Sequence, residues 1–187
     1  MGRFIFKYFS FIIDFLSFTI KLFPLPVKIV IYSFFSNFPS KLGVLFRYIL
    51  LKSICKKMGV NVYISRYVIL KNIENISFGD NVSIHEFSYV DGLGGVFIGD
   101  NVSIAHNSSI ISFEHTYGEL DIPIKYNSLK SKSIEIASDV WVGCGVRILG
   151  GTQIGSRTII AAGSVVKGNL SNNSIYAGIP ANFKKSI

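Results

Sequence analysis

The sequence predicts a mainly β protein, a parallel β-helix that follows an N-terminal helical segment. Three observations support this prediction. Aliphatic or aromatic residues recur every six positions between Phe78 and Val166. The interruptions of this pattern all fall at one phase of a three-unit repeat. The first 57 residues lie outside the pattern and carry the whole excess of positive charge.

Positive charge is concentrated near the N-terminus. The chain of 187 residues, long enough for one domain with a substantial core, has 19 Lys and Arg against 11 Asp and Glu. Residues 1–57 hold nine of the bases and one acid, Asp14, whereas residues 58–187 hold ten of each. We therefore expect residues 1–57 to form a segment distinct from a β-helix domain of residues 58–187.

Residues 1–57 have the pattern of helices. Polar residues recur in steps of four and three, which places them on one narrow stripe of a helix: Arg3, Lys7, Ser10, Asp14, Ser17 and Lys21. Apolar residues occupy the rest of the helix surface. Pro24 and Pro26 are expected to end this helix. Residues 27–38 fit a short helix or a strand, and residues 41–57 fit a further helix with Ser40 as N-cap.

This apolar and basic segment has competing interpretations. A membrane span needs about 20 mostly apolar residues, and Asp14 and Lys21 interrupt the best run. A cleaved signal peptide fits poorly, because Asp14 would lie in its apolar region. We favour helices lying on an anionic membrane surface, at the cytoplasmic face of the inner membrane, with basic residues toward the headgroups. The alternative is packing on the β-helix or on each other.

The six-residue pattern continues through most of the chain. Its apolar positions are Ile64, Leu70, Phe78, Ile84, Val90, Ile98, Ile104, Ile110, Ile136, Val142, Ile148, Ile154, Ile160 and Val166. Small and polar residues, such as the repeated GDNVS unit, separate them. Short units of this kind cannot bury an apolar face alone, so they must stack, which predicts a parallel β-helix.

The irregular steps locate the insertions. The steps from Leu70 to Phe78 and from Val90 to Ile98 are eight residues long, and the step from Ile110 to Ile136 is twenty-six. If three units form one triangular coil, all three insertions leave the same edge. The longest, a loop over residues 111–135, is expected to protrude and to carry function.

Several motifs connect the sequence with a family. They are the GDNVSI units, the segment Phe113-Glu114-His115, residues 136–143 (IASDVWVG) and residues 173–181 (NSIYAGIPA). Over roughly residues 59–187 the chain resembles the hexapeptide-repeat acyltransferases, and within them the maltose and galactoside and the capsule and exopolysaccharide O-acetyltransferases. The resemblance implies a left-handed β-helix, a homotrimer with active sites between protomers, and acetyl-coenzyme A (acetyl-CoA) as the donor.

His115 is the candidate catalytic residue. It lies five residues after Ile110, at the root of the predicted loop. Acyl transfer to an alcohol needs a base for the hydroxyl proton, and imidazole titrates near neutrality. In the resembled family the catalytic histidine occupies this place. Glu114 is a candidate for orienting it, or else a surface carboxylate.

The other candidates concern the two substrates. His85 and Asp91 follow the apolar positions Ile84 and Val90, and the resemblance implies sugar binding near them, although a structural role fits equally well. Trp141, the one tryptophan of the chain, is implied to line the site. The expected contacts of the coenzyme are Trp141, Gly143, Cys144, Ala161, Ala162 and Lys167. The family's usual basic position is shifted here, so Arg157 or Lys184 could replace Lys167.

We therefore expect an acetyl-CoA-dependent O-acetyltransferase acting on a sugar of a surface polysaccharide or its lipid-linked precursor, without metal or nucleic acid. A free sugar, a nucleotide-sugar amine or an antibiotic is the alternative acceptor. A non-enzymatic scaffold and a zinc carbonic anhydrase are remote alternatives. His106 and His115 are nine residues apart, which does not match the zinc pattern of the latter. Two isolated cysteines, Cys55 and Cys144, fit a reducing compartment.

Overall fold

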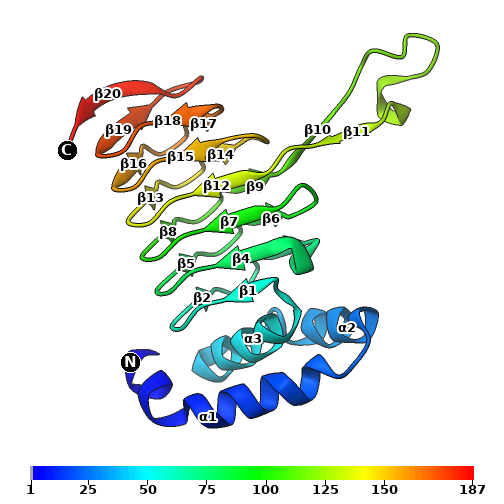
Figure 1. Cartoon of the computed structure of the whole chain (residues 1–187), viewed down its shortest axis with the longest axis vertical. Helices are drawn as coiled ribbons and strands as arrows, with labels where there is room; N and C mark the ends of the chain where they lie inside the picture. Colours follow the sequence, from blue (N-terminus) through cyan, green and yellow to red (C-terminus); the bar gives the residue numbers. More distant parts are fainter. Residues whose placement is uncertain (1) are drawn as a thin grey trace.

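The computed structural model describes the backbone of residues 2–187 and the side chains of residues 10–187. Three helices precede a solenoid of short strands, and a long hairpin projects from the side of the solenoid (Figure 1). The helices are α1 (Gly2–Lys21), α2 (Leu25–Phe35) and α3 (Ser40–Ile54). The predicted class, a parallel β-helix with a helical N-terminal extension, is confirmed.

The strands form three faces, which we name A, B and C. Face A holds β1 (Lys57–Met58), β4 (Ile76–Phe78), β7 (Val96–Ile98), β12 (Ile134–Ile136), β15 (Gln153–Ile154) and β18 (Asn169–Leu170). Face B holds β2 (Tyr63–Ile64), β5 (Ser83–Ile84), β8 (Ser103–Ile104), β13 (Trp141–Val142), β16 (Thr158–Ile160), β19 (Ser174–Ala177) and β20 (Asn182–Ser186). Face C holds β3 (Ile69–Lys71), β6 (Tyr89–Asp91), β9 (Ser109–Ile111), β14 (Arg147–Ile148) and β17 (Val165–Val166). The chain visits the faces in the order A, B, C, so each coil is a triangle.

Parallel pairing stacks the six-residue positions above one another, as predicted. Face A aligns Phe78, Ile98, Ile136 and Ile154. Face B aligns Ile64, Ile84, Ile104, Val142 and Ile160, and face C aligns Leu70, Val90, Ile110, Ile148 and Val166. These side chains are buried and form the core of the solenoid. Burying one such side chain contributes about 1.5–3 kcal/mol, which explains why apolar residues recur at every coil.

The GDN units turn the chain at the edge between faces A and B. Asn81 and Asn101 both have a φ of 57°, in the left-handed region that asparagine tolerates. The Asn81 side-chain amide donates a hydrogen bond to the Asn101 side-chain oxygen (3.1 Å) in the next coil. A Cβ on Gly79 would lie 2.3 Å from a carboxylate oxygen of Asp100 and 2.7 Å from the backbone of Gly99. Only glycine allows the coils to approach this closely.

The predicted alignment of the insertions along one edge is confirmed. Lys71, Asp91 and Ile111 are register partners at the ends of their strands in face C, and each insertion follows one of them. The edge between faces C and A, which we call the C/A edge, therefore carries all three. The first insertion contains the short helix η1 (Ile73–Asn75), and the third contains β10 (Phe113–His115), η2 (Ile124–Tyr126) and β11 (Leu129–Ser131).

The solenoid continues beyond Val166, where the predicted pattern ended. Leu170 pairs with Ile154 in face A, and Tyr176 pairs with Ile160 in face B. Strand β20 then folds back antiparallel to β19. The extra coil was missed because its spacing departs from six residues and Tyr176 replaces an aliphatic residue.

Helix α3 closes the N-terminal end of the solenoid. Leu51 is fully buried, and the Tyr48 hydroxyl donates a hydrogen bond to the Gly59 carbonyl oxygen (2.7 Å). Arg47 is buried, and its Nε donates to the Ile64 carbonyl oxygen (2.9 Å), while its Nη1 donates to that of Phe38 (2.9 Å). The guanidinium thus ties the turn between α2 and α3 to the first coil.

Two predicted boundaries of α3 are wrong. The helix ends at Ile54 rather than at residue 57, because Lys57 already pairs with Ser77 in face A. Its N-cap is Pro39 rather than Ser40, and no side chain caps the helix at that end. Residues 27–38, for which the sequence allowed either a helix or a strand, belong largely to α2.

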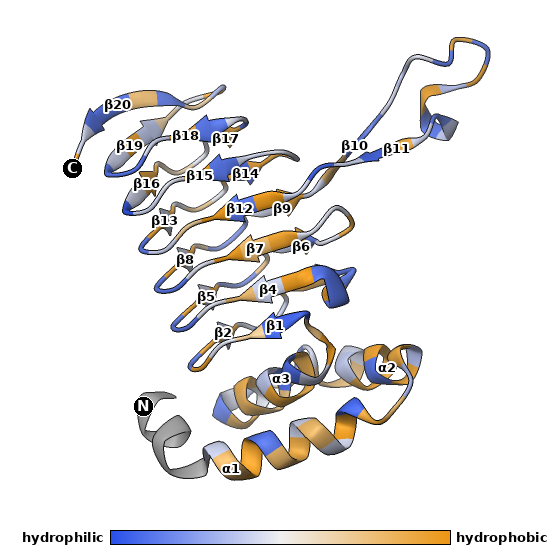
Figure 2. Cartoon of the chain, viewed as in Figure 1, coloured by the Kyte–Doolittle hydropathy of each residue, from blue (hydrophilic) through white to orange (hydrophobic). Residues whose placement is uncertain are grey.

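Helix α1 packs against α3 through part of its polar stripe. The Ser17 hydroxyl donates to the Ile49 carbonyl oxygen of α3 (3.2 Å), and Asp14 forms an ion pair with Lys52 of the same helix. This part of the polar stripe therefore faces the protein, whereas Lys21 is exposed. The side chains of Arg3 and Lys7 lie outside the described residues. Most of the described apolar residues of α1, a helix that is largely orange in Figure 2, are exposed, whereas Ile13 is buried.

Candidate active site

His115 lies on a hairpin that leaves the C/A edge. It ends strand β10, which pairs antiparallel with β11 and places His115 opposite Leu129. Its imidazole is exposed, and the edge of the Phe113 ring contacts it with ring centroids 6.4 Å apart. Paired backbone on both strands holds the imidazole outside the solenoid, where a substrate can reach it.

The root of the hairpin is fixed to the coil below. Ser112 is fully buried, and its hydroxyl donates to the Asp91 carbonyl oxygen (2.7 Å) and accepts from the Gly94 amide (2.8 Å). The Lys132 amide donates to the Ser112 carbonyl oxygen (2.8 Å). Both strands of the hairpin therefore start from a rigid, hydrogen-bonded platform, so His115 has a defined position relative to face C.

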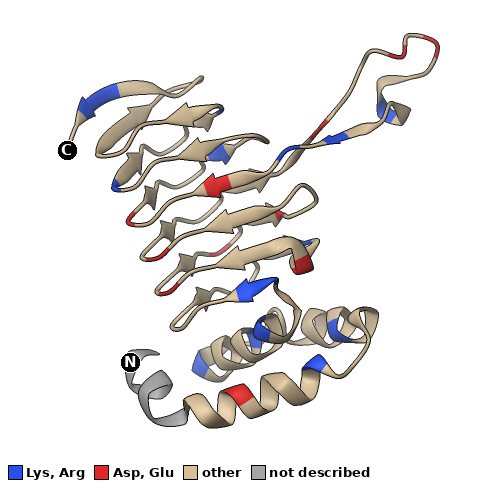
Figure 3. Ribbon diagram, viewed as in Figure 1, with Lys and Arg blue, Asp and Glu red and all other residues tan. Residues whose placement is uncertain are grey.

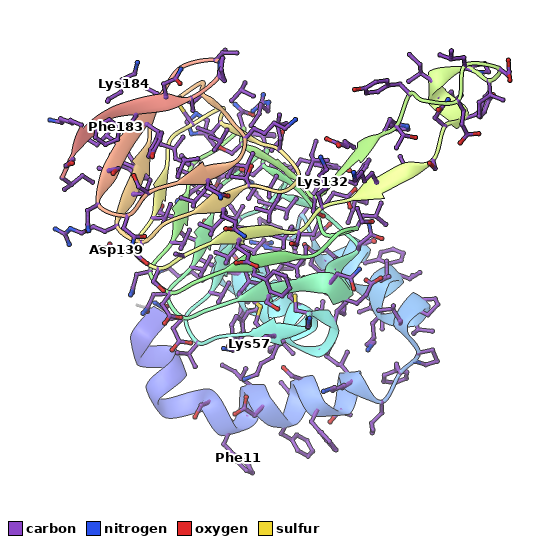
Figure 4. The ribbon with its side chains drawn as sticks, turned by 45° about the horizontal axis from the view of Figure 1, so that its top comes forward. Phe11, Lys57, Lys132, Asp139, Phe183 and Lys184 are labelled. Atoms are coloured by element: carbon purple, nitrogen blue, oxygen red, sulfur yellow. The ribbon has the colours of Figure 1, made fainter. Side chains whose placement is uncertain are left out.

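Charged side chains flank the root. Glu114 forms an ion pair with Lys132, which Figure 4 shows at the base of the hairpin. The hydrogen bond from Lys132 lowers the pKa of the Glu114 carboxyl, and the charges of Lys132 and Lys167 lower it further. Glu114 is therefore paired with Lys132, and among the described residues it forms no hydrogen bond with His115.

Asp91 is built into the platform. It is 6% exposed, and its carboxylate accepts hydrogen bonds from the Asn72 side chain (2.7 Å), the Leu93 amide (3.1 Å) and the Tyr89 hydroxyl (3.1 Å). Burial and the hydrogen bond to Asp91 raise the pKa of Tyr89. These contacts support the structural one of the two roles that the sequence left open for Asp91.

The small residues predicted to contact the coenzyme stack on a second edge, between faces B and C, which we call the B/C edge. Gly143 and Cys144 follow β13, and Ala161 and Ala162 follow β16, directly above them. The Gly143 amide donates to the Ile160 carbonyl oxygen (2.8 Å), and a Cβ on Gly143 would lie 2.6 Å from the Ala162 nitrogen. The coils therefore pack closely at Gly143, and only small side chains cover the backbone along this part of the edge.

The remaining candidates lie on face B, at the B/C edge and at the C/A edge. Trp141 lies on face B and is 55% exposed, and His85 lies at the B/C edge, with its ring 5.7 Å from that of Tyr63. Lys167 follows β17 and belongs to the C/A edge. In a triangular coil the C/A edge is opposite face B. One chain therefore brings His115, Glu114, Asp91 and Lys167 to one side, and Trp141 with the small residues to another.

Ser112 and Lys132 were not selected from the sequence. Ser112 is one of many serines in the repeats, and only its burial under the hairpin distinguishes it. The pairing of Lys132 with Glu114 depends on the register of the hairpin, which no periodicity in residues 111–135 indicated. Within residues 10–187, no group of three His, Cys, Asp or Glu side chains could hold a metal ion.

Comparison with known proteins shows which family the chain is similar to. The family model "Bacterial transferase hexapeptide (six repeats)" matches residues 133–168. The putative lipopolysaccharide biosynthesis O-acetyl transferase WbbJ of Escherichia coli K12 is 32% identical over 125 residues, which are 67% of this chain and 57% of that protein. The chain thus spans little more than half the length of this relative.

Solved structures show the same fold. Galactoside acetyltransferase in complex with coenzyme A has a TM-score of 0.76 and 29% identity, covering 87% of this chain and 82% of that one. The hexapeptide-repeat acetyltransferase VCA0836 of Vibrio cholerae, complexed with acetyl-CoA, has a TM-score of 0.77 at 22% identity, covering 87% and 86%. The chain thus matches the hexapeptide-repeat transferases in sequence and has their left-handed parallel β-helix.

Proposed function

We propose that this protein is an acetyl-CoA-dependent O-acetyltransferase with a sugar hydroxyl as acceptor and His115 as general base. The observation that carries the proposal is the exposed imidazole on a hairpin anchored to the coil by Ser112. The relatives support the donor and the reaction class, because their names include O-acetyl transferase and their complexes contain acetyl-CoA or coenzyme A.

The chemistry follows from what imidazole can do. Acetyl-CoA supplies an acetyl group activated as a thioester. A nitrogen of His115 accepts the proton of the acceptor hydroxyl, so that the oxygen can form the new ester bond while the carbon–sulfur bond breaks. The same proton then passes from His115 to the departing thiolate. General-base assistance of this kind contributes about 10²–10⁴-fold in rate.

The B/C edge fits the donor. Pantetheine is a thin, amide-bearing chain, and the backbone at Gly143, Cys144, Ala161 and Ala162, which only small side chains cover, offers it hydrogen-bonding groups without steric obstruction. Trp141, two residues before Gly143 in β13 on face B, supplies an exposed ring next to this edge. We propose that Lys167, at the C/A edge of a neighbouring protomer, contacts the coenzyme phosphates.

A homotrimer explains why the site is divided. If the C/A edge of one copy meets the B/C edge of the next, His115 faces the donor groove, and a threefold ring closes with three such sites. The tip of the hairpin supports this assembly, because Tyr117, Leu120 and Tyr126 are largely exposed. Apolar side chains gathered at a protruding tip indicate a surface that a protein partner covers.

The reaction can be tested with radiolabelled acetyl-CoA and a panel of capsule-type oligosaccharides, lipid-linked intermediates and free sugars. We expect label on the glycan in an alkali-labile ester, with release of one coenzyme A thiol per ester. Transfer to amines alone would replace the O-acetyl assignment. Absence of thiol release with every acceptor would contradict the proposal.

We further propose that the protein acts at the cytoplasmic face of the inner membrane, on a polysaccharide or lipid-linked acceptor. The support is an apolar surface, which we call the outer helix surface. It consists of Phe11, Ile12, Phe15, Leu16, Phe18, Leu22, Phe23, Val27, Val30 and Phe34, all exposed, with Phe11 at 82%. Phe11 points away from the molecule in Figure 4. Within residues 10–187, no helix is long and apolar enough to cross a bilayer.

Charge favours lipid over a second copy of this surface. Asp14 is the one acid of residues 1–57, and it is paired with Lys52. Lys21 and Lys41 are exposed, and Figure 3 shows basic residues on all three helices. Two identical basic surfaces would repel each other, whereas an anionic bilayer attracts them. Because Lys28 and Arg47 are buried, insertion of apolar side chains contributes more than charge.

We predict that the triple variant Phe11→Ser/Phe15→Ser/Phe18→Ser loses membrane binding. Full-length wild type should float with phosphatidylglycerol-containing vesicles and release only partly in high salt. Each buried phenylalanine is worth about 1.5–3 kcal/mol, so the variant should bind at least tenfold more weakly. Phe183→Ser, at the other end of the molecule in Figure 4, is the matched control and should float like wild type.

Two results would contradict this assignment. Wild type that ignores the vesicles and stays monodisperse would show that the surface needs no lipid. Concentration-dependent assembly beyond the trimer, abolished by the triple substitution, would show that a second copy covers the surface.

A further inference from the structure

Two aromatic residues occupy backbone positions that favour asparagine or glycine. The third residue after each of the face-B strands β2, β5, β8, β13 and β16 turns the chain at the B/C edge in the left-handed conformation: Tyr67 (φ 62°), Phe87 (60°), Asn107 (59°), Gly145 (68°) and Gly163 (70°). Asparagine and glycine tolerate this conformation, whereas a bulky side chain makes it unfavourable. The two lower coils thus keep strained aromatic residues where the coils above have none.

The strain is not explained by core packing. Tyr67 is 42% exposed and Phe87 is 62% exposed. Their rings are stacked, with an interplanar angle of 3° and centroids 5.4 Å apart, so each ring covers one face of the other and the pair projects into solvent as one aromatic stack. The Arg66 guanidinium lies 5.3 Å from the centre of the Tyr67 ring. Strain retained at an exposed position points to function.

A hollow adjoins the two rings. Its volume is about 520 Å³, and Tyr67 and Phe87 line it together with Asn37 and Tyr32 of the helical segment and Asn72 of the first insertion. The Tyr32 hydroxyl is buried and has no hydrogen-bond partner among the described residues. Polar groups beside an aromatic surface suit a sugar, whose C–H bonds meet the ring faces while its hydroxyls take hydrogen bonds.

The height of the rings along the solenoid relates them to the proposed active site. The hairpin with His115 leaves the coil that carries Asn107. A threefold axis parallel to the solenoid keeps heights equal, so a neighbour's His115 meets the B/C edge at this level. The small residues proposed to bind the donor, Gly143 to Ala162, lie in the coils above this level. Phe87 lies one coil below and Tyr67 two coils below, at steps of about 4.8 Å.

We infer that Tyr67 and Phe87 are a subsite for the acceptor glycan, which packs a pyranose ring against the exposed side of this aromatic stack while the next sugar presents its hydroxyl to His115. The inference rests on the proposed function and deepens it. Because one sugar spans about one coil spacing, the preferred acceptor has at least two sugar units. The subsite thus selects oligosaccharides or polymers over free monosaccharides.

Replacing the aromatic residues by asparagine separates binding from folding. In Phe87→Asn and Tyr67→Asn the new side chain suits the left-handed backbone, so the melting temperature should stay equal or rise. We expect KM to rise roughly five- to tenfold per ring for lactose and maltose and to stay unchanged for methyl β-galactoside and methyl α-glucoside, with kcat within about twofold. Phe87→Trp keeps an aromatic face and should retain the low KM. Phe183→Asn, another exposed aromatic residue, is the matched control and should change neither KM.

Saturation-transfer NMR with the same four sugars tests the subsite without turnover. Enhancement of the disaccharides over the monosaccharides in wild type, lost in both asparagine variants, supports it. The subsite is overturned if wild type does not distinguish disaccharides from monosaccharides, or if both asparagine variants keep the distinction. A fall in melting temperature with unchanged KM would also overturn it, because the rings would then serve packing alone. Failure of acetyl transfer with intact NMR discrimination would instead contradict the proposed function.

Discussion

Replacing His115 by alanine should lower acetyl transfer by about 10²–10⁴-fold, the usual contribution of a positioned general base. The side chain is exposed at the end of β10, and the hairpin is held by its backbone and by Ser112 rather than by the imidazole. The variant should therefore fold, assemble and bind coenzyme A as wild type does. Initial rates with saturating acetyl-CoA and calorimetric binding of coenzyme A measure the two properties separately.

Lys185→Ala is a suitable control for this prediction, because Lys185 is exposed in β20 at the C-terminal end of the solenoid. It should leave the rate unchanged. If His115→Ala turned over at a near-normal rate, His115 would have no part in the mechanism. If it lost coenzyme binding together with activity, the imidazole would belong to the donor site.

The solenoid could be predicted from the sequence because its period is local. Each apolar position faces inward whatever the neighbouring coils do, and the GDN units fix the turns through Gly79 and Asn81. The common edge of the insertions followed from phase alone. The end of α3 could not be predicted, because Lys57 pairs with Ser77, a residue of the next coil, and such pairing outweighs helix propensity.

The orientation of α1 could not be predicted for a related reason. Periodicity shows which residues share a face, but it does not show which face meets the protein. Here Ser17 and Asp14 find partners on α3, so the polar stripe packs inward and the phenylalanines remain outside. The hydrogen bond from Lys28 to the Ser53 carbonyl oxygen (3.2 Å) likewise places a base inside the helical layer.

The candidate site was predicted in part. The sequence placed His115 at the root of an insertion and the small residues at one phase of the repeat, and the structure has both. The two sets differ in phase by one unit, which puts them on different edges of the triangle, but periodicity does not show how the edges of neighbouring chains face each other. Nor could it identify Tyr67 and Phe87, whose distinguishing property is a positive φ.

A divided site has a large and specific consequence for mixed trimers. Ala162→Trp should abolish transfer by filling the groove at the B/C edge, where Ala162 is exposed, and should leave the coil intact. His115→Ala abolishes transfer at the C/A edge. In trimers assembled from equal amounts of the two variants, about a quarter of the sites take His115 from one copy and an intact groove from the next.

The measurement that tests this account most directly is therefore acetyl transfer by such mixed trimers, formed by dissociating and reassembling the two inactive variants together. We predict recovery of about a quarter of the wild-type rate per site, with each variant alone remaining inactive after the same treatment. Mixed trimers, verified by mass, that remain as inactive as their parents would contradict the account, because His115 and the small residues of the B/C edge would then not act together across protomers.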